Sequence, residues 1–446
     1  MASDLLTIGL SGAKAARAAL DLTAQNIANA GTAGYVRRSL SLAEVSSTGG
    51  FGQPGKLSLS GVRVDHVVRN ADLFRQAEAR RTGADAARAD IEIGGLQQIE
   101  AAIEQSRLYP SMVGFEGSLQ KLASDPTDPS LRAGVVEAAR TMAATFNIAA
   151  NGLTAASEGL TTGAQSGVRD VNTLATELGR LNLRLARAAD ASSDQSALLD
   201  QRDTLLQQIS SYGDISTTFN ATNGVVDVRI GGSSGPVLVQ GGSANTLAMT
   251  AAPDGTLSFD VGGSAAALSG GSLAGQMLGL AKLAQVSSDL DAAANLMMST
   301  VNTAQAGGAA LDGSAGQPLF SGSGAAGMAL AFTNGAKLAT APAGAPAGSR
   351  DPGNLDALRA ALTSADPTGA ADRLLFDISS TISSRKVTQG ALKAIASNAR
   401  TALEAQSGVD LDAEAVNLLR FQQAFQASGK AMQVAGTIFD TLINLR

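Results

Sequence analysis

The sequence of 446 residues contains no cysteine, no tryptophan and a single histidine. Without cysteine the chain can form neither disulfide bonds nor thiolate metal sites, and it lacks a cysteine nucleophile. His66 lies in a strand-like stretch with no second histidine elsewhere, so a histidine-based metal site or catalytic triad lacks its partners. The fold must therefore hold by packing alone, and we expect no metal and no cofactor.

Aromatic residues make up only 3% of the chain, although hydrophobic residues make up 44%. The apolar content is thus mainly alanine, leucine, valine and isoleucine, which favours close-packed helices over aromatic-rich binding clefts. Acidic residues exceed basic ones by 39 to 33, and neither sign forms a run of five or more. Because no basic stripe is present, we expect no nucleic-acid partner.

Uninterrupted apolar stretches of 18 residues are also absent, so we expect no insertion into a membrane. The N-terminal segment carries Asp4 ahead of its apolar residues and Lys14 and Arg17 among them. These charges interrupt the apolar region that a signal peptide needs, so we expect no cleavable Sec signal.

A seven-residue spacing of apolar side chains is present at both ends of the chain. Near the N-terminus it predicts one amphipathic helix that ends near Gly31. Near the C-terminus it predicts a helix over 411–445 with the seam of a coiled coil. The N-terminal positions are Leu6, Ala13, Leu20 and Ile27; the C-terminal ones are Leu411, Leu418, Phe425, Met432 and Phe439, with Phe421, Ala435 and Leu442 three residues further on.

Because both terminal helices carry heptads, the simplest arrangement pairs them in one domain. An isolated pair of helices is seldom stable, since it buries too little apolar surface to offset the lost chain entropy. Two alternatives remain open at this point. Either neighbouring copies of the chain cover the remaining apolar surface and order the helices, or the central helices of the same chain cover it.

The middle of the chain alternates between helical and strand-like composition. A helix from residue 71 to about 108, ended by Pro110, is predicted, as is a break near 159–167 in a second long helix. Residues 307–350, rich in Gly, Ala, Ser and Pro, predict loop and weakly structured linker. The other expected elements are strands at 56–69 after a Gly/Ser-rich linker at 46–55, helices at 131–189, 196–211, 273–306, 355–362 and 371–404, and short strands at 213–263.

The expected fold is therefore mainly α with a small β portion. Its N- and C-terminal helices pair as a coiled coil, beside a central helical bundle and a short antiparallel β lobe. We expect a terminal coiled-coil assembly domain, a helical bundle domain, a β lobe and a Gly/Ala/Pro-rich linker. Their residues are, in that order, 1–45 with 407–446; 56–212 with 271–306 and 353–406; 213–270; and 307–352.

Three motifs that formally match catalytic or binding signatures are better explained structurally. The G-x-S-x-G match at 231–235 leads into a strand and not a helix, so it reads as a hairpin loop. The G-x-G-x-x-G match at 322–327 follows no convincing strand and precedes no long helix. Glu100 and Glu104 share a helix face, but nearby Arg and Gln residues favour a solvated surface. We therefore expect no enzyme activity and no catalytic residues.

The ends of the chain resemble a known family. Residues 26–37, NIANAGTAGYVR, resemble the motif near the N-terminus of flagellar rod, hook and hook-associated proteins. Residues 407–412, 419–427 and 438–446 resemble the C-terminus of the FlgK family, the hook-associated proteins 1 of the hook–filament junction. Internal stretches at 61–64, 72–75, 198–203 and 271–275 resemble the same family, so the likeness covers nearly the full length.

This resemblance implies a secreted axial protein, exported unfolded through the flagellar type III apparatus and assembling at the hook–filament junction. The implied partners are further copies of the chain in a helical ring or tube, the hook protein, a second junction protein and an export chaperone. The resemblance adds Asn26, Asn29, Gly34, Tyr35 and Arg37 to the heptad residues as candidate assembly residues. Longer family members carry an outer β domain whose place here holds the Gly/Ala/Pro-rich stretch, so that domain is expected to be missing or vestigial.

Two other functions remain possible from the residues. A neighbouring axial protein, such as the second junction protein or a hook or filament subunit, would share the terminal heptads, but residues 198–203 argue against it. A secreted amphipathic adhesive protein would need basic residues along one polar face. The basic residues of the terminal helices, such as Arg17 and Lys430, are too scattered for this.

Overall fold

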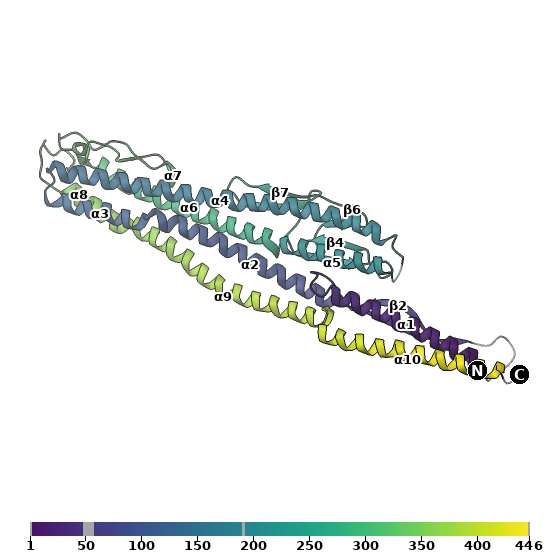
Figure 1. The fold of residues 1–446 in the computed structure, drawn as a ribbon. Helices are drawn as coiled ribbons and strands as arrows, with labels where there is room; N and C mark the ends of the chain where they lie inside the picture. Colours follow the sequence, from purple (N-terminus) through teal and green to yellow (C-terminus); the bar gives the residue numbers. More distant parts are fainter. Residues whose placement is uncertain (1, 48–57, 190–191, 445–446) are drawn as a thin grey trace. The chain divides into compact units, whose positions relative to one another are not determined.

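The computed structural model describes residues 2–47, 58–189 and 192–444. The chain is mainly helical with small antiparallel sheets, and both terminal helices are long, in agreement with the expected fold class (Figure 1). It divides into two compact units. Unit 1 contains Met1–Ala84, Val171–Thr246 and Lys393–Arg446, and unit 2 contains Asp85–Asp170 and Leu247–Leu392.

Unit 1 contains both terminal helices, a hairpin and a four-stranded antiparallel sheet in sequential strand order. Its helices are α1 (Ala2–Ala28), the start of α2 (Leu73–Ser106), the end of α4 (Pro129–Leu185), α5 (Ser193–Tyr212), the end of α9 (Pro367–Ser407) and α10 (Leu411–Asn444). Its strands are the hairpin β1 (Arg38–Ser47) and β2 (Ser58–Arg69) and the sheet β3 (Ile215–Phe219), β4 (Val226–Ile230), β5 (Val237–Gln240) and β6 (Ser243–Ala244).

Helices α1 and α10 lie side by side and antiparallel (Figure 1). Gly9 lies against Met432 and Ser428, Gly12 lies against Ser428, and Asn26 contacts Glu414 at the other end of the pair. A Cβ placed on Gly9 would lie 2.7 Å from Cγ of Met432 and 3.3 Å from the carbonyl oxygen of Ser428. Glycine at this position therefore lets the two backbones approach closely.

The hairpin packs on α1 next to this helix pair. The Ser11 hydroxyl accepts a hydrogen bond of 3.2 Å from the Val62 N–H. Gly61, at φ +98°, passes so close to Ser11 and Ile8 that a side chain would collide with them. Strand β1 is absent from the elements predicted from the sequence, because its alternation of Leu40 and Leu42 with polar residues is short. The predicted linker at 46–55 falls largely outside the described residues.

Unit 2 contains the remaining parts of α2, α4 and α9 and a set of shorter elements. Its other helices are α3 (Leu108–Ser124), α6 (Gly271–Ala306), α7 (Gly324–Gly327) and α8 (Gly353–Ala365), with a 3-10 turn η1 (Gly335–Lys337). Its strands are β7 (Leu247–Ala251), β8 (Leu257–Val261), β9 (Ser264–Ala265), β10 (Gly308–Ala309), β11 (Phe320–Ser321), β12 (Ala329–Leu330) and β13 (Ala341–Pro342). Its core lies between α3, α4, α6 and α8. Within it, the rings of Phe115 and Phe320 pack edge to face, with 6.1 Å between their centres.

Two predicted helix breaks were wrong. Pro110 does not end α2; the helix ends at Ser106, Arg107 adopts a left-handed conformation at φ 57°, and Pro110 lies in the first turn of α3. Proline is tolerated there because the first N–H groups of a helix have no intrahelical partner. Helix α4 runs without a break through Gly163, whose missing side chain leaves room for Gln276 of α6.

The expectation of a weakly structured linker over 307–352 was also wrong. Leu319, Phe320 and Leu338 are almost completely buried in the core of unit 2. The guanidinium group of Arg132 donates to the carbonyl oxygens of Pro126, Gly335 and Leu338 and to the Thr340 hydroxyl. A low-complexity segment thus packs tightly because a buried arginine satisfies backbone groups that no sheet or helix pairs.

The grouping of elements differs from the domains expected from sequence. Strand β2, the start of α2, and α5 with the sheet β3–β6 belong to the same compact unit as the terminal helices. The short strands expected as one β lobe form two sheets, β3–β6 in unit 1 and β7–β9 in unit 2. Composition could not reveal this grouping, because it depends on side-chain contacts between segments far apart in the chain.

Candidate assembly site

Asn26 connects three segments at the end of α1. Its side-chain oxygen accepts hydrogen bonds from the Tyr35 hydroxyl, at 2.8 Å, and from the Arg38 N–H, at 3.1 Å. Its amide nitrogen donates to the Arg38 carbonyl oxygen, at 2.8 Å, and to Oε2 of Glu414, at 3.2 Å. Asn26 is 1% exposed, so these bonds replace water for every polar atom of its side chain.

Glu414 of α10 holds the turn after α1 from the other side. Its carboxylate accepts a hydrogen bond from Nε of Arg37, at 2.7 Å, and its side chain is 2% exposed. The Arg37 N–H donates to the carbonyl oxygen of Ser407, the last residue of α9, at 2.9 Å. The motif over residues 26–37 therefore ties the N-terminal helix to the start of the C-terminal one.

A cluster of arginines and aspartates joins the hairpin to α5. Arg38 and Arg69 both pair with Asp200, at 3.0 and 2.7 Å. Arg69 and Arg202 both pair with Asp203, each at 2.7 Å. The cluster lies in unit 1 and explains why the hairpin and α5 belong to one compact unit.

The charges in this cluster affect one another. Burial raises the pKa of Asp203, but Arg202 and Arg69 outweigh that effect and hold its pKa below the ordinary value. Burial lowers the pKa of the Arg202 guanidinium. This group lies over the Phe219 ring, with its central carbon 4.6 Å from the centre of the ring. Burial also raises the pKa of the Tyr35 hydroxyl. Asp203 is thus a buried carboxylate that stays ionised because of its arginine partners.

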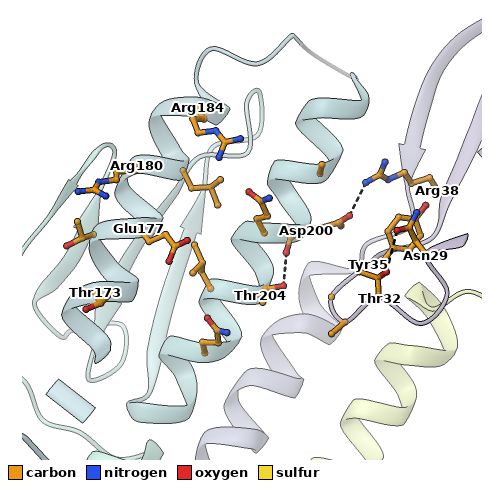
Figure 2. A pocket seen from close by; sticks show the side chains of 18 of the residues that line it. Asn29, Thr32, Tyr35, Arg38, Thr173, Glu177, Arg180, Arg184, Asp200 and Thr204 are labelled. Carbon is orange, nitrogen blue, oxygen red and sulfur yellow. Dashed lines mark hydrogen bonds and ion pairs between the residues drawn. The ribbon is translucent and has the colours of Figure 1, made fainter. Parts of the chain in front are cut away.

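A polar groove of about 1470 Å³ lies beside the turn (Figure 2). Its walls are the turn at residues 29–35, the face of α4 that carries Glu177, Arg180 and Arg184, and the face of α5 that carries Asp200 and Thr204. Asn29, Gly34 and Tyr35 of the motif line it, whereas Arg37 pairs with Glu414 as described above. Charges of both signs line the groove, which suits a protein surface better than a single small ligand.

The heptad residues do not all face the partner helix. On α10, Met432 and Ser428 lie against Gly9 and Gly12 of α1, and Glu414 bonds to Asn26. Ala435 is buried and Phe421 half-buried, whereas Leu411, Phe425 and Phe439 are 54%, 44% and 55% exposed. On α1, Ala13 is buried and Leu20 half-buried, whereas Leu6 and Ile27 are exposed. Leu418 and Met432 are half-buried, and the side chain of Leu442 lies outside the described part of the chain.

The terminal pair leaves much apolar surface in contact with water. Among the described residues, twelve of the twenty-four exposed large apolar side chains lie on α1 and α10, although these helices hold only 27 and 34 residues. Large exposed apolar surfaces are typical of sites where proteins interact with other proteins or with membranes. The twelve are Leu5, Leu6, Ile8, Leu10, Ile27, Leu411, Val416, Leu419, Phe425, Val434, Ile438 and Phe439.

The residues considered for metal binding or acid–base chemistry lie in ordinary structural surroundings. No group of three or more His, Asp or Glu side chains within them could hold a metal ion. His66 on β2 is exposed and contacts Asp65, and Glu100 accepts a hydrogen bond from Ser379. In residues 2–47, 58–189 and 192–444, no helix is long and apolar enough to cross a lipid bilayer.

Several residues of this site were missed by the sequence reasoning. Arg38, Arg69 and Glu414 carried no pattern that distinguished them from surface charges. Asp200 and Asp203 lie in a segment that resembled the family, but their ion pairs with the hairpin could not be inferred from it. A charged residue at a predicted buried helix position, as Glu414 is between Leu411 and Leu418, is the one signal that could have pointed to the site.

Models of protein families match three parts of the chain. Residues 95–320, about half of the chain, match the helical domain of the flagellar hook-associated protein FlgK. Residues 401–445 match the C-terminal part of the flagellar basal body rod proteins FlgEFG, and residues 6–35 match the flagella basal body rod protein. The two end matches contain the terminal helices and the motif around Asn26.

Individual relatives agree with these families. The chain is 25% identical to flagellar hook-associated protein 1 of Bacillus subtilis over 96% of both chains. It is 29% identical to the protein of that name from Salmonella typhimurium over 55% of this chain and 44% of that one, so the match spans less than half of the Salmonella protein. The solved structure of the flagellar hook junction protein FlgK from Burkholderia pseudomallei has the same fold, with a TM-score of 0.65, 15% identity and coverage of 74% of this chain and 99% of that one.

Proposed function

This chain belongs to the FlgK family of flagellar hook-associated proteins, and on that basis we propose that it is a structural subunit of the bacterial flagellum. It assembles at the junction between hook and filament through its terminal helices. The match over 95–320 favours this family over rod, hook and filament subunits, because the end matches alone are shared with rod proteins. The proposed work is mechanical, and no reaction is assigned to the protein.

The observation that carries the proposal is the exposed apolar surface of α1 and α10. Side chains such as Leu6, Leu10, Phe425 and Phe439 lie on two helices that already bury their facing stripes against each other. Fully burying one such side chain is worth about 1.5–3 kcal/mol. The twelve are 36% to 65% exposed, so covering all of them gains about half of this value each, or about 9–18 kcal/mol together. This is comparable with the cost of association, about 4–15 kcal/mol.

The candidate assembly residues divide into two roles in this proposal. The heptad residues that remain exposed make contact with neighbouring copies, whereas Asn26, Tyr35 and Arg37 hold the two helices in register within one copy. Asn29 and Gly34 face the polar groove and are available to a neighbour there. The assembly domain then includes the hairpin and α5, since their ion pairs support the turn.

The proposal extends to partners and location. The subunit reaches the growing flagellum through the type III export apparatus, with the help of a chaperone, and is therefore secreted. It contacts the hook protein on one side and a second junction protein on the other. Absence of cysteine suits this route, because no disulfide has to form outside the cell.

A test changes the exposed heptad positions without disturbing the fold. Phe425→Ser combined with Phe439→Ser removes two apolar side chains that are about half exposed in the single chain. We expect the purified variant to melt within a few degrees of the wild type, because exposed positions contribute little to stability. In cells that lack their own copy of the gene, we expect it to be exported but to fail in supporting filaments and swimming.

Phe376→Ser on α9 of unit 2 is the matched control, because Phe376 is 74% exposed but lies far along the chain from the terminal helices. It should support normal filaments. Normal filaments with the double variant, counted by electron microscopy, would refute the assembly role of these helices. Equal loss with Phe376→Ser would show that the assay reports general surface damage instead.

A further inference from the structure

A second pocket in unit 1, of about 670 Å³, is also lined by the turn, at residues 33–36. One wall is a face of α2 that carries Gln76, Arg80 and Gly83, which are spaced so that they share one side of the helix. The other walls are contributed by α5, with Thr204 and Gln207, and by the end of α9, where Arg400 and Glu404 form an ion pair of 2.8 Å that adds no net charge. No heptad residue of the terminal helices lines this pocket.

Arg80 is the unusual residue of this pocket. It is only 4% exposed, yet its guanidinium group forms no hydrogen bond or ion pair with any residue of the described chain. Its nitrogens are not among the fully buried side-chain atoms that lack a partner, so they keep contact with solvent where Arg80 lines the pocket. A guanidinium group that is otherwise buried is normally paired with an anion. Burial accordingly lowers the pKa of Arg80, and the nearby Arg202 lowers it further, while only Asp203 acts in the other direction.

Asp203 cannot supply the missing partner. Its Oδ1 already accepts hydrogen bonds from Nε and Nη2 of Arg202, and its Oδ2 accepts from Arg69 and Gln76. Four guanidinium groups, those of Arg38, Arg69, Arg80 and Arg202, therefore share two carboxylates, those of Asp200 and Asp203. This buried cluster carries a net charge of about +2 at neutral pH.

The uncharged lining of the pocket adds a second unmet group. The side-chain oxygen of Gln76 is buried and has no hydrogen-bond partner, while its nitrogen is held by Asp203. A ligand that satisfies both Arg80 and Gln76 carries negatively charged oxygens together with a hydroxyl or a bound water. Oxyanions such as hydrogen phosphate or a hydrated carboxylate have this combination.

We propose that the pocket beside Arg80 is a binding site for an oxyanion of the carboxylate or phosphate class, recognised by the Arg80 guanidinium with Gln76 beside it. If the chain assembles as proposed above, the carboxylate of an Asp or Glu side chain from a second copy is available to the site, since the chain has a net charge of −6. A free oxyanion from solution has the same chemistry. The anion neutralises the buried charge and bridges α2 to α5 and α9, next to the turn that holds the terminal helices.

The test uses the full chain and sodium phosphate as the probe, titrated against sodium chloride of equal ionic strength. Binding is followed by calorimetry and by hydrogen exchange of peptides from 73–84 and 396–407. We expect saturable binding to the wild type and slower exchange in both segments. Arg80→Met, which keeps the apolar stem, should weaken binding about tenfold or more, whereas Arg80→Lys should retain part of it.

Arg81→Met is the matched control, because the neighbouring Arg81 is exposed, does not line the pocket, and changes the net charge equally. It should bind phosphate like the wild type. The melting temperature is a second measurement. If Arg80 only stabilised the fold, Arg80→Met would melt at a lower temperature than the wild type. Without phosphate, Arg80→Met should melt at the same temperature as the wild type or higher, because it removes a buried unpaired charge.

No saturable binding to the wild type, or equal loss in Arg80→Met and Arg81→Met, would overturn the site. A lower melting temperature of Arg80→Met with unchanged phosphate binding would overturn it as well. Sedimentation then distinguishes the sources of the anion. If phosphate weakens self-association of the wild type, a carboxylate of a second copy occupies the site; if association is unaffected, the ligand is a free oxyanion.

Failure of the proposed function leaves a different pattern. Phosphate binding through Arg80, together with normal filaments when Phe425 and Phe439 are both changed to Ser, would support the anion site and refute the assembly role of the helices. No phosphate binding, together with a loss of filaments in the double variant, would support the assembly role and refute the anion site.

Discussion

Replacement of Asn26 by alanine tests whether the turn after α1 holds the terminal helices together. The change removes all four hydrogen bonds of the Asn26 side chain. The N–H and carbonyl oxygen of Arg38 then remain buried without a partner, because Arg38 is only 8% exposed. Glu414 keeps its bond to Arg37, and the partly buried Tyr35 hydroxyl can reach water.

The expected loss follows from these two backbone groups. Each unsatisfied buried group costs about 1–3 kcal/mol, so the change should destabilise the turn by about 2–6 kcal/mol. At about 1.4 kcal/mol per factor of ten, the amide hydrogen of Arg38 should exchange between about 30-fold and about 20,000-fold faster than in the wild type. Local exchange is the suitable measurement, because a chain with two compact units has no single unfolding free energy.

Hydrogen exchange on peptides that cover residues 35–45 measures this directly. Asn29→Ala is the control, because the Asn29 side chain makes only surface hydrogen bonds, to the carbonyl oxygen of Gln25 and from the Thr32 hydroxyl. The control should change exchange by about 0.5 kcal/mol or less. Unchanged protection of Arg38 in Asn26→Ala, or equal loss in both variants, would refute the hydrogen-bonding role of Asn26.

Three further changes test other parts of the structure. Gly9→Ala should loosen the α1–α10 pair and speed exchange in both helices, because the new Cβ collides with Met432, whereas Gly429→Ala, which meets nothing within 4 Å, should be neutral or stabilise by up to about 1 kcal/mol. Arg132→Ala should destabilise the segment over 307–352 by about 3–5 kcal/mol and expose it to proteases, since several buried carbonyls lose their donor. The pKa of Asp203 is lower in the folded chain than in the unfolded chain, where it is about 3.9. The ionised carboxylate therefore stabilises the fold above about pH 3.9, and this stabilisation is lost as the pH falls through the pKa of the folded chain. Between about pH 5 and pH 2 the melting temperature should fall more steeply for the wild type than for Asp203→Asn.

For each of these three predictions, one outcome or control decides whether it is wrong. Equal exchange in the Gly9 and Gly429 variants would mean that the helices do not approach closely at Gly9. Arg140→Ala, which removes a solvent-exposed arginine of the same helix, should leave the segment over 307–352 resistant to proteases. Parallel melting curves for the wild type and Asp203→Asn would show that the arginine cluster does not hold Asp203 ionised.

Periodic patterns in the sequence were sufficient to predict the helical class and the positions of most long helices. The bounds of α1, α5, α6 and α10 follow from apolar spacing and from the residues that end helices. Such patterns are local, because one face of a helix is visible in the order of its own residues. The predictions failed where one residue type occurs in two kinds of structure. Pro110 was expected to end a helix but lies in the first turn of one, and Gly163 was expected to break a helix but leaves room for Gln276.

The sequence alone determined that this is a cysteine-free, mainly helical chain with apolar heptads at both ends and the motifs of one flagellar family. Only the tertiary structure decided which stripe of α10 meets α1 and which apolar side chains remain exposed. It also decided that Asn26, Glu414 and the Arg–Asp cluster form one connected site, and that Arg80 lacks a partner. The physical reason is that hydrogen bonds and ion pairs between distant segments depend on distances of a few ångströms between side chains, and the order of residues along the chain does not contain those distances.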